Sequence, residues 1–243
     1  MNAMNDYEDI PVLYEDESLI AVDKPTGLAV HKNDFMPRDA DYLTKIIGQK
    51  YNRSVYNVHR LDAKTSGVIL LAFSQDVAAL LTRQFEQKQV SKRYIAIVKG
   101  NPGEGTFDSK VVVKKKSKFK KPAITHYRTL QTVDTALTTK DGLPLQLSIV
   151  EVSPQTGRWH QVRQHFARHR YDIIGDTHHG DFSLNRLITG KTGIKRLMLH
   201  AGELEFIHPT SSSRITATAI SPEAFARMLD VMGACGAMKF TNR

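Results

Sequence analysis

The segment 58–67 carries the first residues whose types and spacing could do chemistry. In it, Asp62 follows the cation Arg60 by two positions, and Thr-Ser-Gly leads directly into the apolar run 68–73. A carboxylate in a turn at the mouth of a buried strand is well placed for covalent or acid–base chemistry. Aspartate is also a common turn residue, so a capping role without chemistry is the alternative interpretation.

A second candidate lies in the segment 158–169, which the spacing of its apolar residues predicts to be a helix. At about 100° per residue, Trp159, Val162 and Phe166 share one face, and Arg163 falls within it. We therefore expect Arg163 to point inward. A guanidinium cannot shed its charge, so it needs a carboxylate or phosphate partner. A structural ion pair is the plainer interpretation of this arginine, and a functional one is the alternative.

Histidines in the same region raise a metal-site hypothesis. His165 and His169 are four residues apart, as in helical metal sites, and the segment 176–181 contains further aspartate and histidine side chains. The corresponding function would be that of a metal-dependent nuclease or phosphoesterase. No glutamate accompanies the helical pair, however, and aspartate and histidine in a glycine-containing loop can serve turn contacts alone. We therefore predict no metal site at these residues.

The composition is that of an ordinary globular protein with a basic excess. The 243 residues are 41% hydrophobic and 24% charged, with a formal net charge of +9. This positive excess favours a polyanionic partner, and nucleic acid is the first candidate. Cys235 is the only cysteine, so an internal disulfide and a cysteine-rich zinc cluster are excluded. The N-terminal residues resemble no export signal, and no apolar run has membrane-spanning length. We expect a cytoplasmic protein.

Positive charge is concentrated in the segment 110–121, which contains seven lysines in twelve residues. Such a run is often only a solvated hairpin tip. With Phe119 inside it and the basic balance of the chain, the run favours a loop that contacts phosphates and contributes salt-dependent affinity. The lysines that we expect to contact an RNA backbone are Lys114, Lys115, Lys116, Lys118, Lys120 and Lys121.

The elements that must position these residues alternate between β-favouring runs and helical patterns. We predict a single α+β domain over 1–243, with its core at about 10–220, built around a mixed, mostly antiparallel β-sheet with flanking helices. Strands are predicted at 10–14, 19–22, 94–98, 123–133, 143–152, 196–200, 204–207 and 214–219. Helices are predicted at 41–50, 75–87, 158–169 and 222–232, with a long polar loop over 170–193.

Four ordered motifs resemble those of RluA-type pseudouridine synthases. His-Arg-Leu-Asp at 59–62 with Thr-Ser-Gly at 65–67 resembles the family's signature, and the hairpin region 14–28 resembles its N-terminal segment. Residues 92–100 are similar to the second motif, and 157–163 with 199–209 to the third. Segments 122–128 and 173–186 are most similar to the branch that modifies uridine 65 of tRNA.

The resemblance implies that the protein isomerises a uridine in RNA. The N1–C1′ glycosidic bond is broken and the base is rejoined to the sugar through C5, without a metal or organic cofactor. Asp62 would be the catalytic residue. It could attack C1′ or assist abstraction of a sugar proton, and the sequence leaves both routes open.

The resemblance also implies roles for four further residues. Arg163 would pair with Asp62 and keep its carboxylate ionised and aimed. Tyr94 would stack on the base, and Leu199 would line the pocket wall. Arg60 would enter the duplex and occupy the place of the extruded uridine, because the base must leave its stack to react. For Tyr94 and Leu199, core packing is the alternative.

The sequence departs from the family pattern at Ala63, where an arginine commonly follows the aspartate. We expect no separate N-terminal RNA-binding domain, so the catalytic domain and the lysine run would capture the substrate. The expected partner is RNA, and tRNA is the first candidate. We expect neither membrane association nor an obligate protein partner. An rRNA substrate and a non-catalytic RNA-binding protein are the alternatives.

Overall fold

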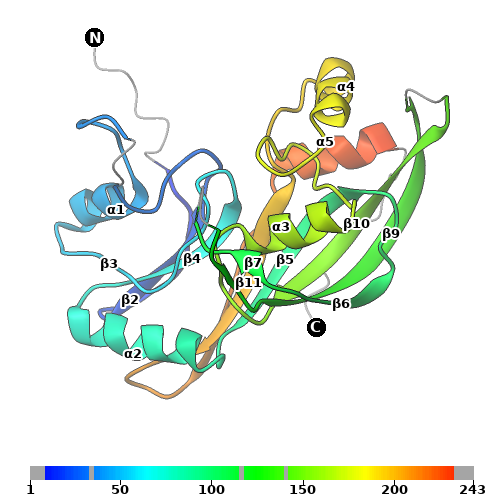
Figure 1. The fold of residues 1–243 in the computed structure, drawn as a ribbon. Coiled ribbons are helices and arrows are strands. Elements are labelled where there is room, and N and C mark those ends of the chain that lie inside the picture. Colours follow the sequence, from blue (N-terminus) through cyan, green and yellow to red (C-terminus); the bar gives the residue numbers. More distant parts are fainter. Residues whose placement is uncertain (1–8, 33–35, 115–117, 140–141, 233–243) are drawn as a thin grey trace, which may run out of the picture. The chain divides into compact units, whose positions relative to one another are not determined.

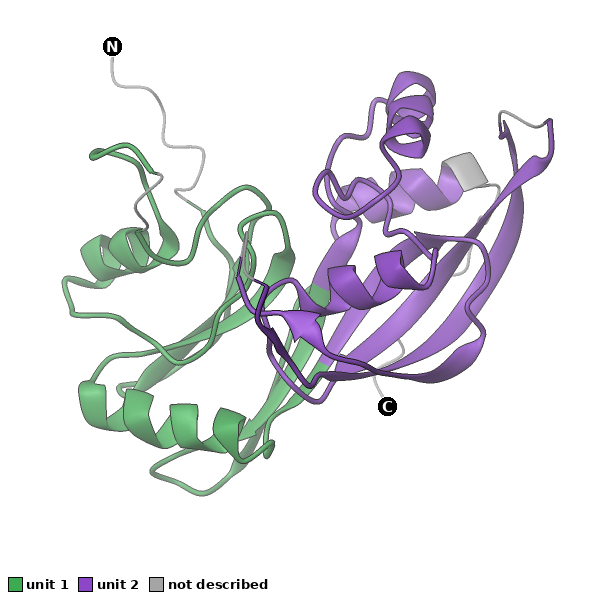
Figure 2. Ribbon diagram, viewed as in Figure 1, with its two compact units in different colours: residues 1–92, 201–220 green, residues 93–200, 221–243 purple. Residues whose placement is uncertain are grey.

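The computed structural model describes residues 9–32, 36–114, 118–139 and 142–232. The chain forms two compact units, drawn in different colours in Figure 2, and each unit combines two separate stretches of sequence. Unit 1 comprises residues 1–92 and 201–220, and unit 2 comprises residues 93–200 and 221–243. The prediction of a single domain over 1–243 stays a prediction.

Unit 1 is built on a sheet whose strands follow the order β1-β2-β4-β11, with β12 on β11 and β3 on β4 (Figure 1). The predicted hairpin is confirmed, because β1 pairs antiparallel with β2. β2 also pairs antiparallel with β4, from Leu19 opposite Ala72 to Lys24 opposite Gly67. The strands are β1 (Val12–Glu15), β2 (Leu19–Lys24), β3 (Tyr56–Asn57), β4 (Ser66–Ala72), β11 (Leu199–Ile207) and β12 (Arg214–Thr218).

Two helices accompany this sheet, α1 (Leu43–Tyr51) and α2 (Gln75–Glu86). α2 begins where predicted because the side chain of Ser74 accepts a hydrogen bond from the Val77 N–H and so caps the first turn. α2 contacts β3 and β4, and its buried Leu81 joins the apolar core of unit 1. Every residue of β4 is buried, as expected of an interior strand.

Unit 2 contains the strand order β11-β5-β10-β9-β6, in which β10 pairs antiparallel with both β5 and β9. The first residues of β11 belong to this unit, and the strand continues into unit 1. α3 contacts β7, β9 and β10, and α5 contacts β9. The elements are β5 (Ser91–Lys99), β6 (Glu104–Asp108), β7 (Val111–Val112), β8 (Lys120–Lys121), β9 (Ile124–Thr138), β10 (Pro144–Pro154), α3 (Gln161–Arg168), α4 (Phe182–Thr192) and α5 (Glu223–Met232).

The architecture confirms the predicted α+β class with a mostly antiparallel sheet and flanking helices. Apolar side chains from strands and helices form one buried cluster in each unit. No helix in the described ranges is long and apolar enough to cross a membrane.

The observed elements differ from the predicted ones in several places. The helix predicted at 158–169 begins at Gln161, because His160 adopts a left-handed backbone (φ 49°) that ends the helix on its N-terminal side. The expected polar loop over 170–193 contains α4, whose N-terminus is capped by Asp181. The strands predicted at 196–200 and 204–207 form the single strand β11.

Candidate active site

Asp62 lies in a tight turn that ends where β4 begins. The Thr65 N–H donates to the Asp62 carbonyl at 3.0 Å, which closes the turn. Val58 and Leu61, which precede the turn, are buried, and Val58 belongs to the apolar core of unit 1. Asp62 itself is half-buried. Arg60 is exposed. The turn therefore anchors its backbone while it leaves the Arg60 side chain accessible.

Residues 24–28 bind the backbone of this turn at two successive carbonyls. The Ala63 carbonyl accepts the Gly27 N–H at 2.7 Å, and the Lys64 carbonyl accepts the Thr26 hydroxyl at 2.7 Å. Gly27 has φ of 91°, a conformation that glycine adopts without steric cost. The two segments that resemble family motifs at 14–28 and 59–67 are thus hydrogen-bonded to each other.

Lys24 adds a third link to the Asp62 turn. Its side chain is fully buried, and its ammonium donates to the carbonyls of Pro25, Leu28 and Ala63 at 2.7, 2.9 and 3.1 Å. A buried lysine is tolerated only when its donors are satisfied. This role of Lys24 was not predicted from the sequence. The available signal was a lysine at the end of an apolar strand, directly before Pro25.

His59 connects the turn to β4. Its Nε2 accepts the Leu70 N–H at 2.9 Å, so this ring nitrogen carries no proton, and the ring stacks on Phe85 with centroids 4.5 Å apart. Burial, helped by the nearby charge of Lys92, lowers the pKa of His59 to about 3. The ring is therefore neutral at physiological pH and serves as a fixed acceptor next to the exposed Arg60.

Gly67 allows close packing of two strands immediately after the turn. It has φ of 112°, and a Cβ atom added there would lie 2.1 Å from the Ala201 carbonyl oxygen of β11. Any side chain at this position would clash with the backbone of β11. The glycine of the Thr-Ser-Gly motif therefore has a steric reason, separate from chemistry.

Arg163 lies in unit 2 and points inward, as the helical-wheel argument predicted. The residue is 3% exposed. Its Nε and Nη2 donate to Oδ2 and Oδ1 of Asp176 at 2.8 and 2.7 Å, a bidentate ion pair. Arg163 was predicted to need a carboxylate or phosphate partner, and Asp176 is a carboxylate partner in the structure. The expected pairing of Arg163 with Asp62 joins residues of different units and stays a prediction.

Asp176 also organises the loop that follows it. Its Oδ1 accepts the backbone N–H groups of His178 and His179 at 2.8 and 3.1 Å. Burial opposes ionisation of Asp176, but the hydrogen bonds and charge of Arg163, with these two N–H groups, outweigh it and lower the pKa to about 2. The loop is therefore tied to α3 by an ionised carboxylate.

Tyr94 and Leu199, predicted to contact the base, belong to the apolar core of unit 2. Leu199 is 3% exposed and Tyr94 is half-buried against the same cluster. Core packing, the alternative interpretation, accounts for these contacts. Their stacking and pocket-wall roles stay predictions.

The helical pair His165 and His169 is occupied by other interactions. Nδ1 of His165 lies 2.9 Å from the Thr125 hydroxyl and its Nε2 lies 3.1 Å from the Ser109 carbonyl, while His169 stacks on Phe107. With both ring nitrogens of His165 bonded, this pair offers no open metal site. These contacts give no support to the alternative hypothesis of a metal-dependent nuclease at this pair.

A different histidine group is gathered beside the Asp176 loop. One ligand nitrogen from each of His160, His178 and His179 lies within 4.8 Å of the others. Burial, reinforced by the charge of Arg163, lowers the pKa of His160 to about 2, and burial lowers that of His179 to about 4. These two rings are therefore neutral at physiological pH.

The lysine run spans the short hairpin of β7 and β8, and residues 115–117, including Lys115 and Lys116, lie outside the described residues. Its described lysines from 114 onward are exposed, namely Lys114, Lys118, Lys120 and Lys121. Phe119 is also exposed, at 62%. Exposed lysines are compatible with a solvated hairpin tip and with a loop that contacts RNA phosphates.

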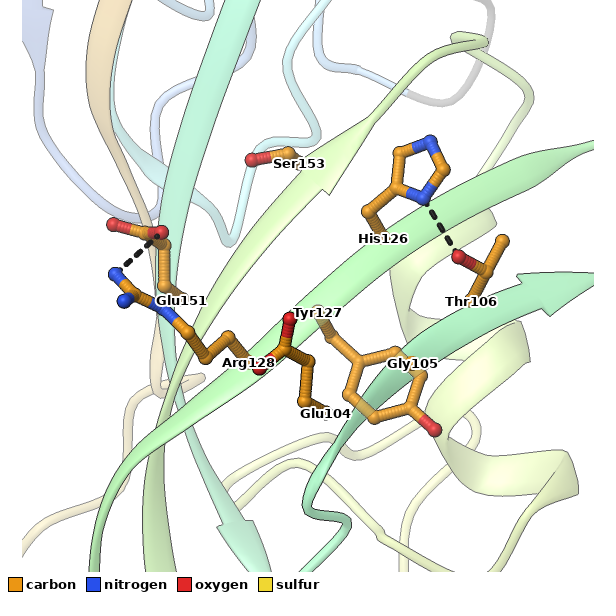
Figure 3. A pocket seen from close by; sticks show the side chains of 8 residues that line it. All are labelled: Glu104, Gly105, Thr106, His126, Tyr127, Arg128, Glu151 and Ser153. Carbon is orange, nitrogen blue, oxygen red and sulfur yellow. Dashed lines mark hydrogen bonds and ion pairs between the residues drawn. The ribbon is translucent and has the colours of Figure 1, made fainter.

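A pocket of about 300 Å³ opens over strands β6, β9 and β10 (Figure 3). His126 Nδ1 lies 2.7 Å from the Thr106 hydroxyl, and Arg128 pairs with Glu151 across the strands. The other lining residues are Glu104, Gly105, Tyr127 and Ser153. None of the side chains with a predicted site role lines this pocket.

Comparisons with known proteins agree on one family. The sequence model described as RNA pseudouridylate synthase matches residues 18–168. A protein of Haemophilus ducreyi named tRNA pseudouridine synthase C is 37% identical over 234 residues, which cover 93% of this chain and 96% of that protein. A protein of Yersinia pestis with the same name is 38% identical over 237 residues, which cover 93% and 92% of the two chains.

Solved structures show the same relationship. The human RNA pseudouridylate synthase domain containing 4 matches with a TM-score of 0.67 at 26% identity, over 92% of this chain and 93% of that chain. The matched residues 18–168 include both the Asp62 turn and residues 24–28 that hold it. The chain belongs to the RNA pseudouridylate synthase family.

Proposed function

We propose that this protein isomerises a specific uridine of tRNA to pseudouridine in the cytoplasm, with position 65 as the expected target. The family supports the reaction, and the names of the bacterial relatives support tRNA as the substrate. The structural observation that carries the proposal is the Asp62 turn, whose backbone is held on one side by residues 24–28 and on the other by β4.

Asp62 is the proposed catalytic group. Pre-organisation matters because the carboxylate must meet C1′ or a sugar proton in a defined geometry. The hydrogen bonds at Ala63 and Lys64 fix the chain immediately after Asp62, so the position of its Cα is set before substrate binds. Both the nucleophilic route and the proton-abstraction route remain compatible with this arrangement.

The remaining roles follow the family resemblance. Arg60, which is exposed, is proposed to take the place of the flipped uridine in the RNA. Tyr94 is proposed to stack on the base, Leu199 to line its pocket, and Arg163 to keep Asp62 ionised. The described exposed lysines of the segment 114–121 are proposed to contact RNA phosphates.

The experiment that tests the reaction is substitution Asp62→Asn. Asparagine keeps the size of the side chain but cannot act as a nucleophile or base at this position. We expect pseudouridine formation on tRNA to fall below detection, while RNA binding and the thermal unfolding midpoint stay near the wild-type values. Asp108→Asn, at an exposed strand end in unit 2, is the matched control and should retain activity. Appreciable turnover by Asp62→Asn would contradict the assignment.

The target is tested separately by mapping pseudouridine across tRNA and rRNA in a strain that lacks this protein. Loss of pseudouridine at tRNA position 65 supports the proposal. Loss of an rRNA site would move the substrate to rRNA. Full retention of all sites, together with unimpaired RNA binding, would favour a non-catalytic RNA-binding protein.

A further inference from the structure

His160, His178 and His179 form a cluster to which the proposed function assigns no role. Their ligand nitrogens all lie within 4.8 Å of one another, and Nδ1 of His160 lies 3.0 Å from Nε2 of His179. The three rings meet edge to face, with centroids 4.5 to 5.3 Å apart. The cluster therefore places three imidazole nitrogens close enough together to be tested as ligands of one ion.

We propose that these three histidines bind one divalent transition-metal ion of the kind that prefers imidazole, with Zn²⁺ as the representative. Imidazole nitrogens suit zinc, copper and nickel, whereas magnesium and calcium prefer oxygen ligands. A site with three protein ligands leaves one coordination position for water or a phosphate oxygen. This proposal departs from the sequence prediction of no metal site.

One nitrogen–nitrogen distance in the cluster is close to that of a zinc site, and all three ligand atoms lie within 4.8 Å of one another. Zn–N bonds of about 2.0–2.1 Å in a tetrahedral site place neighbouring ligand nitrogens about 3.4 Å apart. The His160–His179 pair is already at 3.0 Å, so only a small movement separates the observed contact from a shared metal. In that contact one neutral ring donates an N–H to the other. When a metal binds, the donating ring adopts its other tautomer, so that both nitrogens present lone pairs to the ion.

The surrounding structure holds the cluster in place. His160 is the residue that precedes α3, and Arg163 of the same helix is bonded to Asp176. Asp176 in turn accepts the backbone N–H groups of His178 and His179. One buried ion pair therefore ties the two parts of the cluster together, which limits the ordering cost of metal binding.

Trp159 supplies a built-in reporter for the experiment. It is the only tryptophan of the chain, and its ring stacks on His160 with centroids 3.9 Å apart. Cu²⁺ and Ni²⁺ quench tryptophan fluorescence at short range. Binding at the cluster should therefore quench the emission of Trp159, whereas binding at a distant surface histidine should leave it largely unchanged.

The test uses full-length protein without a His-tag, freed of metal by chelation and kept near neutral pH. Zn²⁺ binding is measured by calorimetry, and Ni²⁺ binding by quenching of Trp159. We expect one ion per chain. His178→Gln and His179→Gln should each weaken binding by about tenfold or more, since even outer contacts of metal sites contribute that much. His160→Asn should do the same, and asparagine tolerates the left-handed backbone at this position.

Two controls separate the cluster from other ligands. His126→Gln removes a half-buried histidine of unit 2 that bonds to Thr106, and Cys235→Ser removes the only thiol. Both variants should bind Zn²⁺ as the wild type does. No saturable binding by the wild type, unchanged binding by His178→Gln, or loss of binding in either control would overturn the proposal. Each variant is compared with the wild type by thermal unfolding, so that loss of the fold is recognised.

Discussion

Arg163 and Asp176 form a bidentate ion pair in which both side chains are almost completely buried. The pair bridges α3 to the loop that follows it in sequence. A buried ion pair is poor evidence of net stabilisation, but removal of one partner leaves an uncompensated charge in the interior. This asymmetry makes the pair sensitive to single substitutions.

Substitution Arg163→Met should lower the free energy of unfolding by about 3–5 kcal/mol, because it strands the Asp176 carboxylate. The measurement is urea denaturation. Arg168→Met is the matched control on the same helix, because Arg168 is exposed and bonds only to Ser109 and the Lys110 carbonyl among the contacts described. We expect that variant to lose less than about 1 kcal/mol. Equal losses in the two variants would contradict the importance of the buried pair.

The penalty in Arg163→Met should depend on pH. In the wild type, the pKa of Asp176 is about 2, below its ordinary 3.8, so its ionised form stabilises the fold above pH 3.8 and this contribution is lost as pH falls through about 2. Without Arg163 the folded-state pKa rises, and acid relieves the stranded charge. We expect the difference in unfolding free energy between wild type and variant to narrow from about pH 7 to about pH 3. If the difference in unfolding free energy did not change with pH, the destabilisation of Arg163→Met would come from lost packing alone.

Gly67→Ala should destabilise the protein much more than Gly103→Ala. Both glycines have positive φ, so both substitutions strain the backbone, by about 1–2 kcal/mol for the left-handed conformation of Gly103. Only Gly67 would also place its Cβ 2.1 Å from the Ala201 carbonyl oxygen, whereas nothing lies within 4 Å of a Cβ at Gly103. We expect an additional loss of about 3 kcal/mol at Gly67, or failure to fold. Urea denaturation of the two variants measures the difference, and equal stability would rule out the clash.

Substitution of Lys118, Lys120 and Lys121 with glutamine should weaken RNA binding and flatten its dependence on salt. Each phosphate contact that is lost should reduce the slope of log affinity against log salt concentration by about one unit or slightly less. Turnover at saturating RNA should change little, because these side chains take no part in the reaction.

The control for this experiment is a charge-matched variant in which Lys50, Lys191 and Lys195, which are exposed elsewhere, become glutamine. Salt-dependent affinity is measured for both triple variants. The same change in both would show that net charge alone is responsible. An unchanged salt slope in the first variant would identify the lysine run as a solvated hairpin.

Local patterns predicted much of the fold. Apolar residues at helical spacing predicted α2, and two β-favouring runs separated by polar residues predicted the first hairpin. α4 was missed although Asp181, the buried Leu184 and Ile188, and Gly193 carry the signals of a capped helix. Those signals occupy a short, polar segment in which turn residues dominate the composition.

The sequence predicted which residue types form the site better than it predicted which residues those side chains contact. The helical wheel showed that Arg163 needs a buried acid, but the choice of Asp176 depends on how a distant loop folds back onto α3. Lys24 could not be assigned because its partners are backbone carbonyls, which every residue possesses. The left-handed backbone of His160, which brings its ring to His178 and His179, has no clear signature in the sequence.

The buried ammonium of Lys24 links the Asp62 turn to residues 25–28 through three carbonyls. Because this amine is fully buried, an amine-reactive reagent can reach it only when these segments separate. The rate at which Lys24 is labelled in the native protein therefore reports how often the Asp62 turn opens. The labelling rate of Lys24 thus measures the opening of the turn that carries Asp62.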